Sequence, residues 1–206
     1  MRAEAVLGID VSTALCEVLA ALRTEATCRQ DVSPTGMVWR TVLQVLRTLR
    51  APGRVQRKSV PVCAWLPADS EDPLTSVLLQ ALPQLTWSGN SSYRDETFLQ
   101  RYGYCELIGD GPWPSDTARV GTLLLAPHTE YRAHAHAAEE IYLVLHGAAR
   151  WQVGDDAPLS VVPRDVVHHP SGVAHAMQTS ELPLLALYCW RGAIDAPARL
   201  LGDGLP

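Results

Sequence analysis

The chain has 206 residues, of which 47% are hydrophobic and 19% are charged. This length corresponds to about one to one and a half domains of roughly 150 residues, and the apolar fraction excludes disorder over the whole length. Lys and Arg total 17 and Asp and Glu total 22, which gives a formal charge of −5. Such a chain lacks the basic surface of a nucleic-acid-binding protein. Its apolar runs are too short for a helix that crosses a membrane.

The cysteines and the first residues of the chain indicate in which cellular compartment the protein is expected. The first ten residues contain no uninterrupted apolar segment, so we expect no secretory signal. The cysteines are odd in number, widely spaced and without a CxxC pair, which predicts reduced thiols in a cytoplasmic protein. They are Cys16, Cys28, Cys63, Cys105 and Cys189.

The pattern of apolar residues changes near residue 100. Before it, apolar residues recur at helical spacing in three segments, at about 12–22, 36–50 and 73–82. Residues 87–93 (WSGNSSY) resemble a turn. After it, Gly and Pro separate short β-prone runs, which is typical of a sandwich or barrel. These runs are 119–125, 140–145, 148–153, 159–162, 166–168, 174–179 and 184–190.

The order of elements therefore predicts a mainly β fold with two parts. Residues 1–100 are expected to form a helical N-terminal extension, and residues 101–206 a β-barrel. Edge strands of a barrel need covering, and a homodimer through the extension or a barrel edge would cover them.

All seven histidines fall between residues 128 and 175. We interpret His128, His146 and His169 as surface loop residues. The others carry a pattern, because side chains at even spacing along a strand share one face. Four polar residues have this parity: His134, His136, Glu140 and Tyr142.

Burying such a row of polar side chains inside a barrel is energetically unfavourable unless partner groups or an ion compensate for the lost water. Imidazole nitrogens and a carboxylate oxygen are common ligands of divalent metals, and His175, at the start of a later β-run, completes a set of four. A hydrogen-bonded polar network without metal is the alternative.

The histidine region resembles the cupin family. The segment His134-x-His136-x3-Glu140-x6-Gly147 matches the first cupin motif, and Pro170-x-Gly172-x2-His175 matches the centre of the second. The resemblance implies a double-stranded β-helix (jelly-roll) barrel that binds one metal ion through His134, His136, Glu140 and His175. Three positions depart from the motifs: His128 and Arg164 stand where glycines are usual, and Thr179 replaces an asparagine.

A narrower resemblance, over about residues 90–195, is to the cupin-type dimethylsulfoniopropionate (DMSP) lyases. It is carried by Tyr131-x2-His134-x-His136-x2-Glu139-Glu140-x-Tyr142, by VHHPSGVAHAMQT and LLALYCWRG, and by Tyr102-x-Tyr104-Cys105-Glu106-Leu107. It implies β-elimination of DMSP to dimethyl sulfide and acrylate, with one divalent ion (Zn, Fe, Mn, Ni or Co) per chain. Tyr142 is implied as the base, with Tyr131 assisting as a second base or a lid residue.

A sulfonium substrate needs aromatic faces around its charge. Candidates for this wall are Trp190, Tyr188, Trp113, Trp151 and Tyr102, and core packing is the alternative role for each. His168 is a further candidate, either for a substrate contact or for a hydrogen bond behind the metal ligands, and an exposed turn is its alternative.

Other functions remain open at this stage. Another metal-dependent cupin enzyme, an isomerase or a dioxygenase acting on a small carboxylate or sugar, would carry the same motifs. A cupin that only binds a small ligand is a third reading, although simple binding does not require a phenol beside a metal ligand. The expected partner is a small molecule, with no nucleic acid and no membrane.

Overall fold

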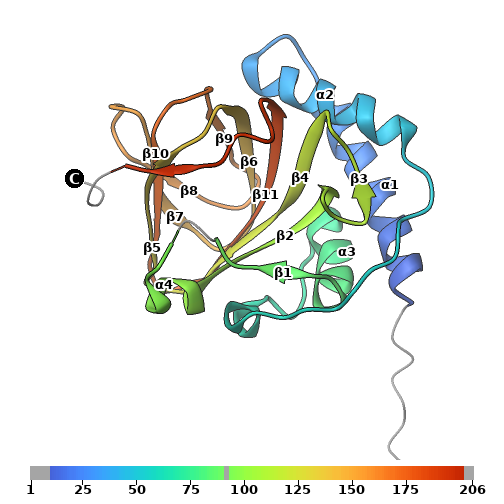
Figure 1. Cartoon of the computed structure of the whole chain (residues 1–206), viewed down its shortest axis with the longest axis horizontal. Helices are drawn as coiled ribbons and strands as arrows, with labels where there is room; N and C mark the ends of the chain where they lie inside the picture. Colours follow the sequence, from blue (N-terminus) through green and yellow to red (C-terminus); the bar gives the residue numbers. More distant parts are fainter. Residues whose placement is uncertain (1–9, 91–92, 202–206) are drawn as a thin grey trace, which may run out of the picture.

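The three longest helices precede the strands along the chain and pack on one side of a β-barrel (Figure 1). The computed structural model describes residues 10–90 and 93–201. Its helices are α1 (Val11–Arg29), α2 (Pro34–Thr48), α3 (Pro73–Ala81) and α4 (Glu96–Arg101), with short 3-10 helices at Pro61–Trp65 and Leu82–Gln84. The three helices expected from apolar spacing are therefore confirmed. Within the described ranges, no helix combines the length and apolar character needed to cross a membrane.

The strands form two sheets that close into the barrel. The first, of seven strands, has the order β1-β2-β4-β11-β6-β9, with β3 beside β2, and the second has the order β12-β5-β10-β7-β8. The bounds are β1 (Trp87–Ser88), β2 (Tyr102–Gly109), β3 (Trp113–Pro114), β4 (Ala118–Leu125), β5 (Glu130–Ala135), β6 (Ala138–His146), β7 (Ala149–Val153), β8 (Leu159–Val161), β9 (Val166–His169), β10 (His175–Thr179), β11 (Leu184–Gly192) and β12 (Arg199–Leu200). The mainly β fold class is confirmed.

Two expectations about strands are wrong. Trp87 and Ser88 were expected in a turn, but they form β1 and pair with Cys105 and Tyr104 of β2. The row from His134 to Tyr142 was expected on one strand, but it crosses from β5 to β6, which belong to different sheets. The polar side chains still converge, because the inner faces of both sheets line the same barrel interior.

Alternate residues of the large sheet face two different cores. In β6, Ile141, Leu143 and Leu145 pack with the helices in an outer core, whereas Tyr142 and Val144 belong to a second core inside the barrel. This is the alternation expected of a strand buried on both faces. The helices and the sheet thus share one apolar core, and the division at residue 100 stays a prediction.

Arg164 connects the turn before β9 to the helices. Its backbone is left-handed (φ 80°), a conformation that favours glycine. Its Nη2 donates to both carboxylate oxygens of Glu25 in α1, at 2.8 and 3.0 Å, and its Nη1 donates to Asp72 at 3.2 Å. Asp72 also accepts the backbone N–H of Thr75 at the start of α3. The side chain therefore joins two helices to the barrel at a position where its backbone is strained.

We expect Arg164→Ala to lower the free energy of unfolding by about 1 kcal/mol, because it removes the ion pairs and keeps the strained backbone. Arg164→Gly should be the more stable of the two variants by about 1 kcal/mol, because glycine removes the strain. Urea unfolding of the three proteins measures both differences. An Arg164→Ala protein as stable as the wild type would show that the ion pairs contribute nothing.

Candidate active site

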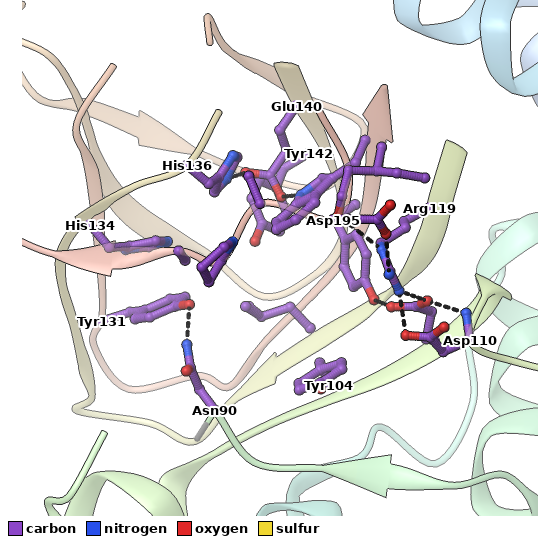
Figure 2. A pocket seen from close by; sticks show the side chains of 18 of the residues that line it. Asn90, Tyr104, Asp110, Arg119, Tyr131, His134, His136, Glu140, Tyr142 and Asp195 are labelled. Atoms are coloured by element: carbon purple, nitrogen blue, oxygen red, sulfur yellow. Dashed lines mark hydrogen bonds and ion pairs between the residues drawn. The ribbon is translucent and has the colours of Figure 1, made fainter. Parts of the chain in front are cut away.

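A cavity of about 290 Å³ lies inside the barrel. Both sheets contribute to its wall, and residues 194–198, after β11, also line it. Figure 2 shows two polar groups facing this space, with His134 and His136 on one side and Arg119, Asp110 and Asp195 on the other.

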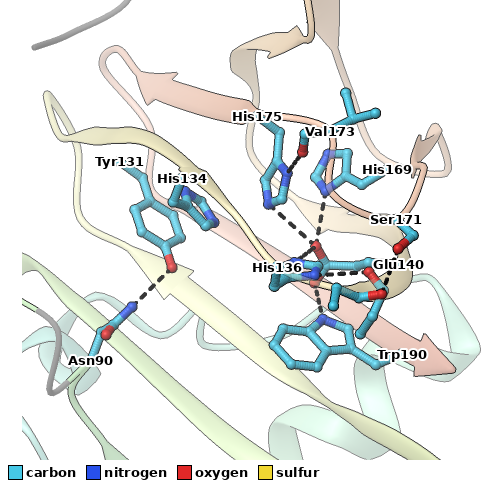
Figure 3. Close-up of polar contacts among 12 residues, drawn as sticks. Asn90, Tyr131, His134, His136, Glu140, His169, Ser171, Val173, His175 and Trp190 are labelled. Carbon is cyan, nitrogen blue, oxygen red and sulfur yellow. Dashed lines mark hydrogen bonds and ion pairs between the residues drawn. The ribbon is translucent and has the colours of Figure 1, made fainter. Parts of the chain in front are cut away.

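Three of the four residues expected to bind metal form a buried cluster. The nearest donor atoms of His136, Glu140 and His175 lie within 4.8 Å of one another. Nε2 of His136 lies 3.1 Å from Oε2 of Glu140, and Nε2 of His175 lies 3.6 Å from the same oxygen (Figure 3). The fourth residue, His134, lies outside this group of three but touches it, with its ring centroid 4.2 Å from that of His175.

Backbone carbonyls fix the proton positions on these histidines. Nδ1 of His134 lies 2.9 Å from the carbonyl of Arg132, Nδ1 of His136 lies 2.9 Å from that of Ala138, and Nδ1 of His175 lies 3.1 Å from that of Val173. A carbonyl only accepts, so each Nδ1 carries a proton and each neutral ring presents the lone pair of Nε2. Metal-binding histidines in proteins are oriented by this kind of contact.

The donor set fits a divalent metal ion. In the described residues, Nε2 of His175 is buried without a hydrogen-bond partner. Lone pairs of His136 and His175 therefore point at a carboxylate oxygen, an arrangement that is unfavourable unless a cation lies between them. A proton on His136 is one such cation, and a metal ion is the other.

Burial keeps two of the imidazoles neutral. It lowers the pKa of His134 to about 4 and holds the pKa of His175 well below its usual value. Burial alone would raise the pKa of Glu140, but the hydrogen bond from His169 and the contact with a protonated His136 hold it well below the usual range. Neutral imidazoles beside an ionised carboxylate are the protonation states that bind metal.

His169 was expected in a surface loop, and this expectation is wrong. Its side chain is fully buried, and its Nδ1 donates to Oε2 of Glu140 at 2.9 Å. Its Nε2 accepts the indole N–H of Trp151 at 2.9 Å, and its ring stacks on His175 with centroids 3.7 Å apart. The parity of β9 contains the signal, because Val167 faces the inner core and His169 lies two residues further on.

Trp190 completes the contacts of Glu140. Its indole N–H donates to Oε1, so each carboxylate oxygen accepts a hydrogen bond (Figure 3). The centroid of its ring lies 4.2 Å from that of the His136 ring. Trp190 therefore touches both the anion of the cluster and one of its imidazoles.

The other predicted residues divide into two groups. Tyr102, Tyr131, Tyr142 and Tyr188 line the cavity together with Trp190. Trp113, Trp151 and His168 are not among the lining residues, so the structure does not bring these three candidates to the cavity. Trp113 packs in the outer core and donates its indole N–H to the carbonyl of Arg50, because β3 lies outside the barrel. His168 faces outward, and its Nε2 donates to Glu139 at 2.8 Å.

The two candidate bases differ in their contacts. The hydroxyl of Tyr131 accepts a hydrogen bond from Nδ2 of Asn90 at 3.2 Å, and its ring stacks on His134. The hydroxyl of Tyr142 makes no hydrogen bond to any described residue, although the side chain is 4% exposed. Burial raises the pKa of both, to about 12 for Tyr131 and well above the usual value for Tyr142.

The barrel and its inward histidines define a cupin. Comparisons with known proteins narrow the class further. The model of the dimethylsulfoniopropionate lyase family matches residues 37–186, nearly three-quarters of the chain. The chain therefore belongs to the DMSP lyase family.

Individual relatives agree with this assignment. The chain is 37% identical to dimethylsulfoniopropionate lyase DddQ of Ruegeria pomeroyi over 59% of its own length and 60% of that protein. It is 30% identical to the putative dimethylsulfoniopropionate lyase DddL of Cereibacter sphaeroides over 58% of its own length and 51% of that protein. The aligned part thus spans only about half to three-fifths of these curated relatives.

Two solved structures match over almost the whole fold. The structure reported for the DMSP lyases RdDddP and RnDddQII superposes with a TM-score of 0.75 and 27% identity, covering 94% of this chain and all of the other. The DMSP lyase DddQ of Ruegeria pomeroyi DSS-3 gives 0.74 and 26%, covering 92% and 98%. The shared structure therefore includes the N-terminal helices as well as the barrel.

We expect Glu140→Gln to abolish stoichiometric metal binding, because it removes the anionic donor and retains the shape of the side chain. Metal analysis of the dialysed proteins measures this. In a thermal melt, added Zn²⁺ should raise the Tm of the wild type and leave that of the variant unchanged. A variant with full metal content would exclude Glu140 as a ligand.

His169→Phe tests the support behind the cluster. The substitution keeps a buried ring and removes the hydrogen bond to Glu140, so metal affinity should fall by about 10- to 100-fold. Competition with a chelator of known affinity provides the measurement, and His128→Phe, at an exposed histidine, is the control. Equal affinities in the wild type and His169→Phe would limit His169 to a packing role.

Proposed function

We propose that this chain is a metal-dependent carbon–sulfur lyase that cleaves DMSP to dimethyl sulfide and acrylate by β-elimination. Family membership over residues 37–186 supports the reaction class. The observation that carries the proposal is the cavity itself, which joins a His–Glu cluster to a phenol that makes no hydrogen bond to any described residue. A carboxylate beside a cation, next to a proton acceptor, is what the elimination requires.

The proposed ligands are His134, His136, Glu140 and His175, with one divalent transition metal ion per chain. Zn, Fe, Mn, Ni and Co all suit three imidazoles and a carboxylate. When bound, such an ion supplies a Lewis acid for the substrate carboxylate and for the negative charge that develops on it. His169 and Trp190 hold the Glu140 carboxylate in one orientation throughout.

Tyr142 is the proposed base. Its hydroxyl oxygen, as phenolate, takes the proton from the carbon next to the carboxylate. The electron pair of that C–H bond forms the double bond of acrylate, and the pair of the C–S bond leaves with sulfur as dimethyl sulfide. Burial raises the pKa of Tyr142, so a nearby cation must stabilise the phenolate. Its hydroxyl makes no hydrogen bond to a described residue, which supports this role, because no such bond has to break first.

Tyr131 is proposed to assist. Its ring stacks on that of His134, with centroids 4.1 Å apart, and Asn90 donates to its hydroxyl. These contacts orient the phenol next to the cluster. The rings of Tyr102, Tyr188 and Trp190 are proposed as faces for the substrate, because they line the same cavity.

The assembly and location belong to the proposal as well. We propose a cytoplasmic protein, which the five free cysteines support. We also propose a homodimer that covers the edge strands of the sheets. The division into a helical extension and a barrel at residue 100 is retained as a proposal.

Headspace analysis for dimethyl sulfide tests the reaction. Protein loaded with each of Fe, Mn, Zn, Ni and Co should release dimethyl sulfide from DMSP with at least one metal. Absence of release with all five would exclude the lyase function while leaving the metal site intact. Oxygen uptake or sugar isomerisation by the same samples would favour another cupin enzyme.

Tyr142→Phe should lower kcat by about 100-fold or more, because a positioned base contributes on that scale. Metal content should be unchanged. Tyr131→Phe should have a smaller effect on kcat. The reverse order of the two effects would assign the base to Tyr131.

A further inference from the structure

The far end of the cavity contains a second charged group that the proposed reaction leaves unused. Asp110, Arg119 and Asp195 lie opposite the histidines (Figure 2), and Glu106, which is bonded to Arg119, lines the same cavity. Three carboxylates surround one guanidinium, so the group has a formal charge of −2. Asp110 and Asp195 are exposed, whereas the side chain of Glu106 is only 13% exposed. Glu106 is therefore the carboxylate that is buried against the cavity.

Arg119 is already occupied by these partners. Its Nη1 donates to Glu106 and to Asp110, each at 2.7 Å, and its Nη2 donates to Asp195 at 3.1 Å. Its Nε donates to the carbonyl of Ile194 at 3.1 Å. An arginine with these contacts is a poor anchor for a substrate carboxylate. Because three carboxylates outnumber one guanidinium, the net charge that this end of the cavity presents to a ligand is negative.

Glu106 is held in a fixed position. Its Oε1 accepts from Arg119 and from the backbone N–H of Asp110, and its Oε2 accepts the Tyr188 hydroxyl at 3.3 Å. Gly121 lies between these two residues in register, paired with Glu106 on one side and Tyr188 on the other. A Cβ on Gly121 would lie 2.4 Å from the Tyr188 hydroxyl. The glycine therefore lets the tyrosine reach across β4 to the carboxylate.

The same row of neighbours includes Tyr142. Tyr142 pairs with Tyr188, so the row passes from β6 through β11 and β4 to Glu106 in β2. Three strand spacings separate the backbones of Tyr142 and Glu106 by roughly 14 Å. Tyr142 is 4% exposed and lines the cavity, and its hydroxyl has no partner in the described ranges. This phenol, which lines the cavity, leaves a hydrogen-bonding position for a ligand between the two ends.

We propose that Glu106 is the counter-charge that selects the onium end of the substrate. This inference rests on the proposed function, in which the substrate carboxylate lies at the histidine end. It predicts that a quaternary ammonium group two carbons from the carboxylate binds in place of the sulfonium group of DMSP. Onium groups have no N–H donors, so they are recognised by charge and aromatic faces, and Tyr104, Tyr188 and Trp190 supply those faces. Glu106 is a specificity residue and takes no part in proton transfer.

Binding of two matched carboxylates tests the proposal without turnover. 3-(Trimethylammonio)propanoate is cationic at its far end, and 4,4-dimethylpentanoate has the same shape without the charge. In calorimetry with Zn²⁺-reconstituted wild type, the cationic ligand should bind about tenfold more tightly. Glu106→Gln should lose this preference by weakening only the cationic ligand.

Glu25→Gln is the matched control, because Glu25 is also paired with an arginine and has an 11% exposed side chain, but it lies in α1. It should retain the wild-type preference. If Glu106→Gln does not fold, Glu106→Asp keeps the charge at a greater distance and should show an intermediate preference. Equal affinities for the two ligands in the wild type, or equal weakening of both in the variant, would overturn the role of Glu106.

The outcomes separate this proposal from the function on which it rests. Dimethyl sulfide release by a protein that binds both carboxylates equally would retain the lyase and remove the role of Glu106. A cationic preference without dimethyl sulfide release would retain the onium site and remove the lyase. Binding of neither carboxylate would overturn the inference together with the placement of the substrate.

Discussion

The buried carboxylate of Glu140 is the group on which the rest of the site depends. It is 1% exposed, and a charge at that depth is strongly unfavourable without partners. Its partners come from neighbouring strands, since Glu140 pairs with His169 of β9 on one side and with Trp190 of β11 on the other. Strand register alone thus brings two hydrogen-bond donors to the anion. A slip of one residue would turn the whole row toward the helices, so the apolar outer core and the polar site enforce the same register.

The sequence predicts the parts of this arrangement that depend on periodicity. Apolar spacing is sufficient for α1, α2 and α3 and for most of the barrel strands, because one face of each is buried. It fails for β2, where Gly103 interrupts the pattern. That glycine is required by tertiary space, because a Cβ would lie 2.9 Å from side-chain atoms of Val60 and Val62. No local pattern contains this information.

The residues of the site also divide into those that periodicity predicts and those that depend on tertiary structure. Parity correctly placed Glu140 and Tyr142 on the inner face of β6 and the apolar residues that alternate along the strand on the outer face. It wrongly placed His134 on the same strand, because parity does not indicate where a chain leaves one sheet for another. The role of His169 depends on its partner across the sheet, and register between distant strands is visible only in the folded chain. For the same reason, Trp113 could not be separated from the cavity aromatics by sequence alone.

Two turns show that tertiary contacts determine whether a left-handed backbone position has to be glycine. Gly147 and Arg164 have the same φ of 80°. A Cβ on Gly147 would lie 1.8 Å from the carbonyl of Pro183, so this position has to be glycine. Arg164 carries a side chain at the same backbone angle and uses it to reach Glu25 in α1. The helices therefore stabilise the barrel from outside by packing on the large sheet and by this ion pair. Because apolar burial is concentrated on that outer face, the inner face can carry charged and aromatic groups that the cavity requires.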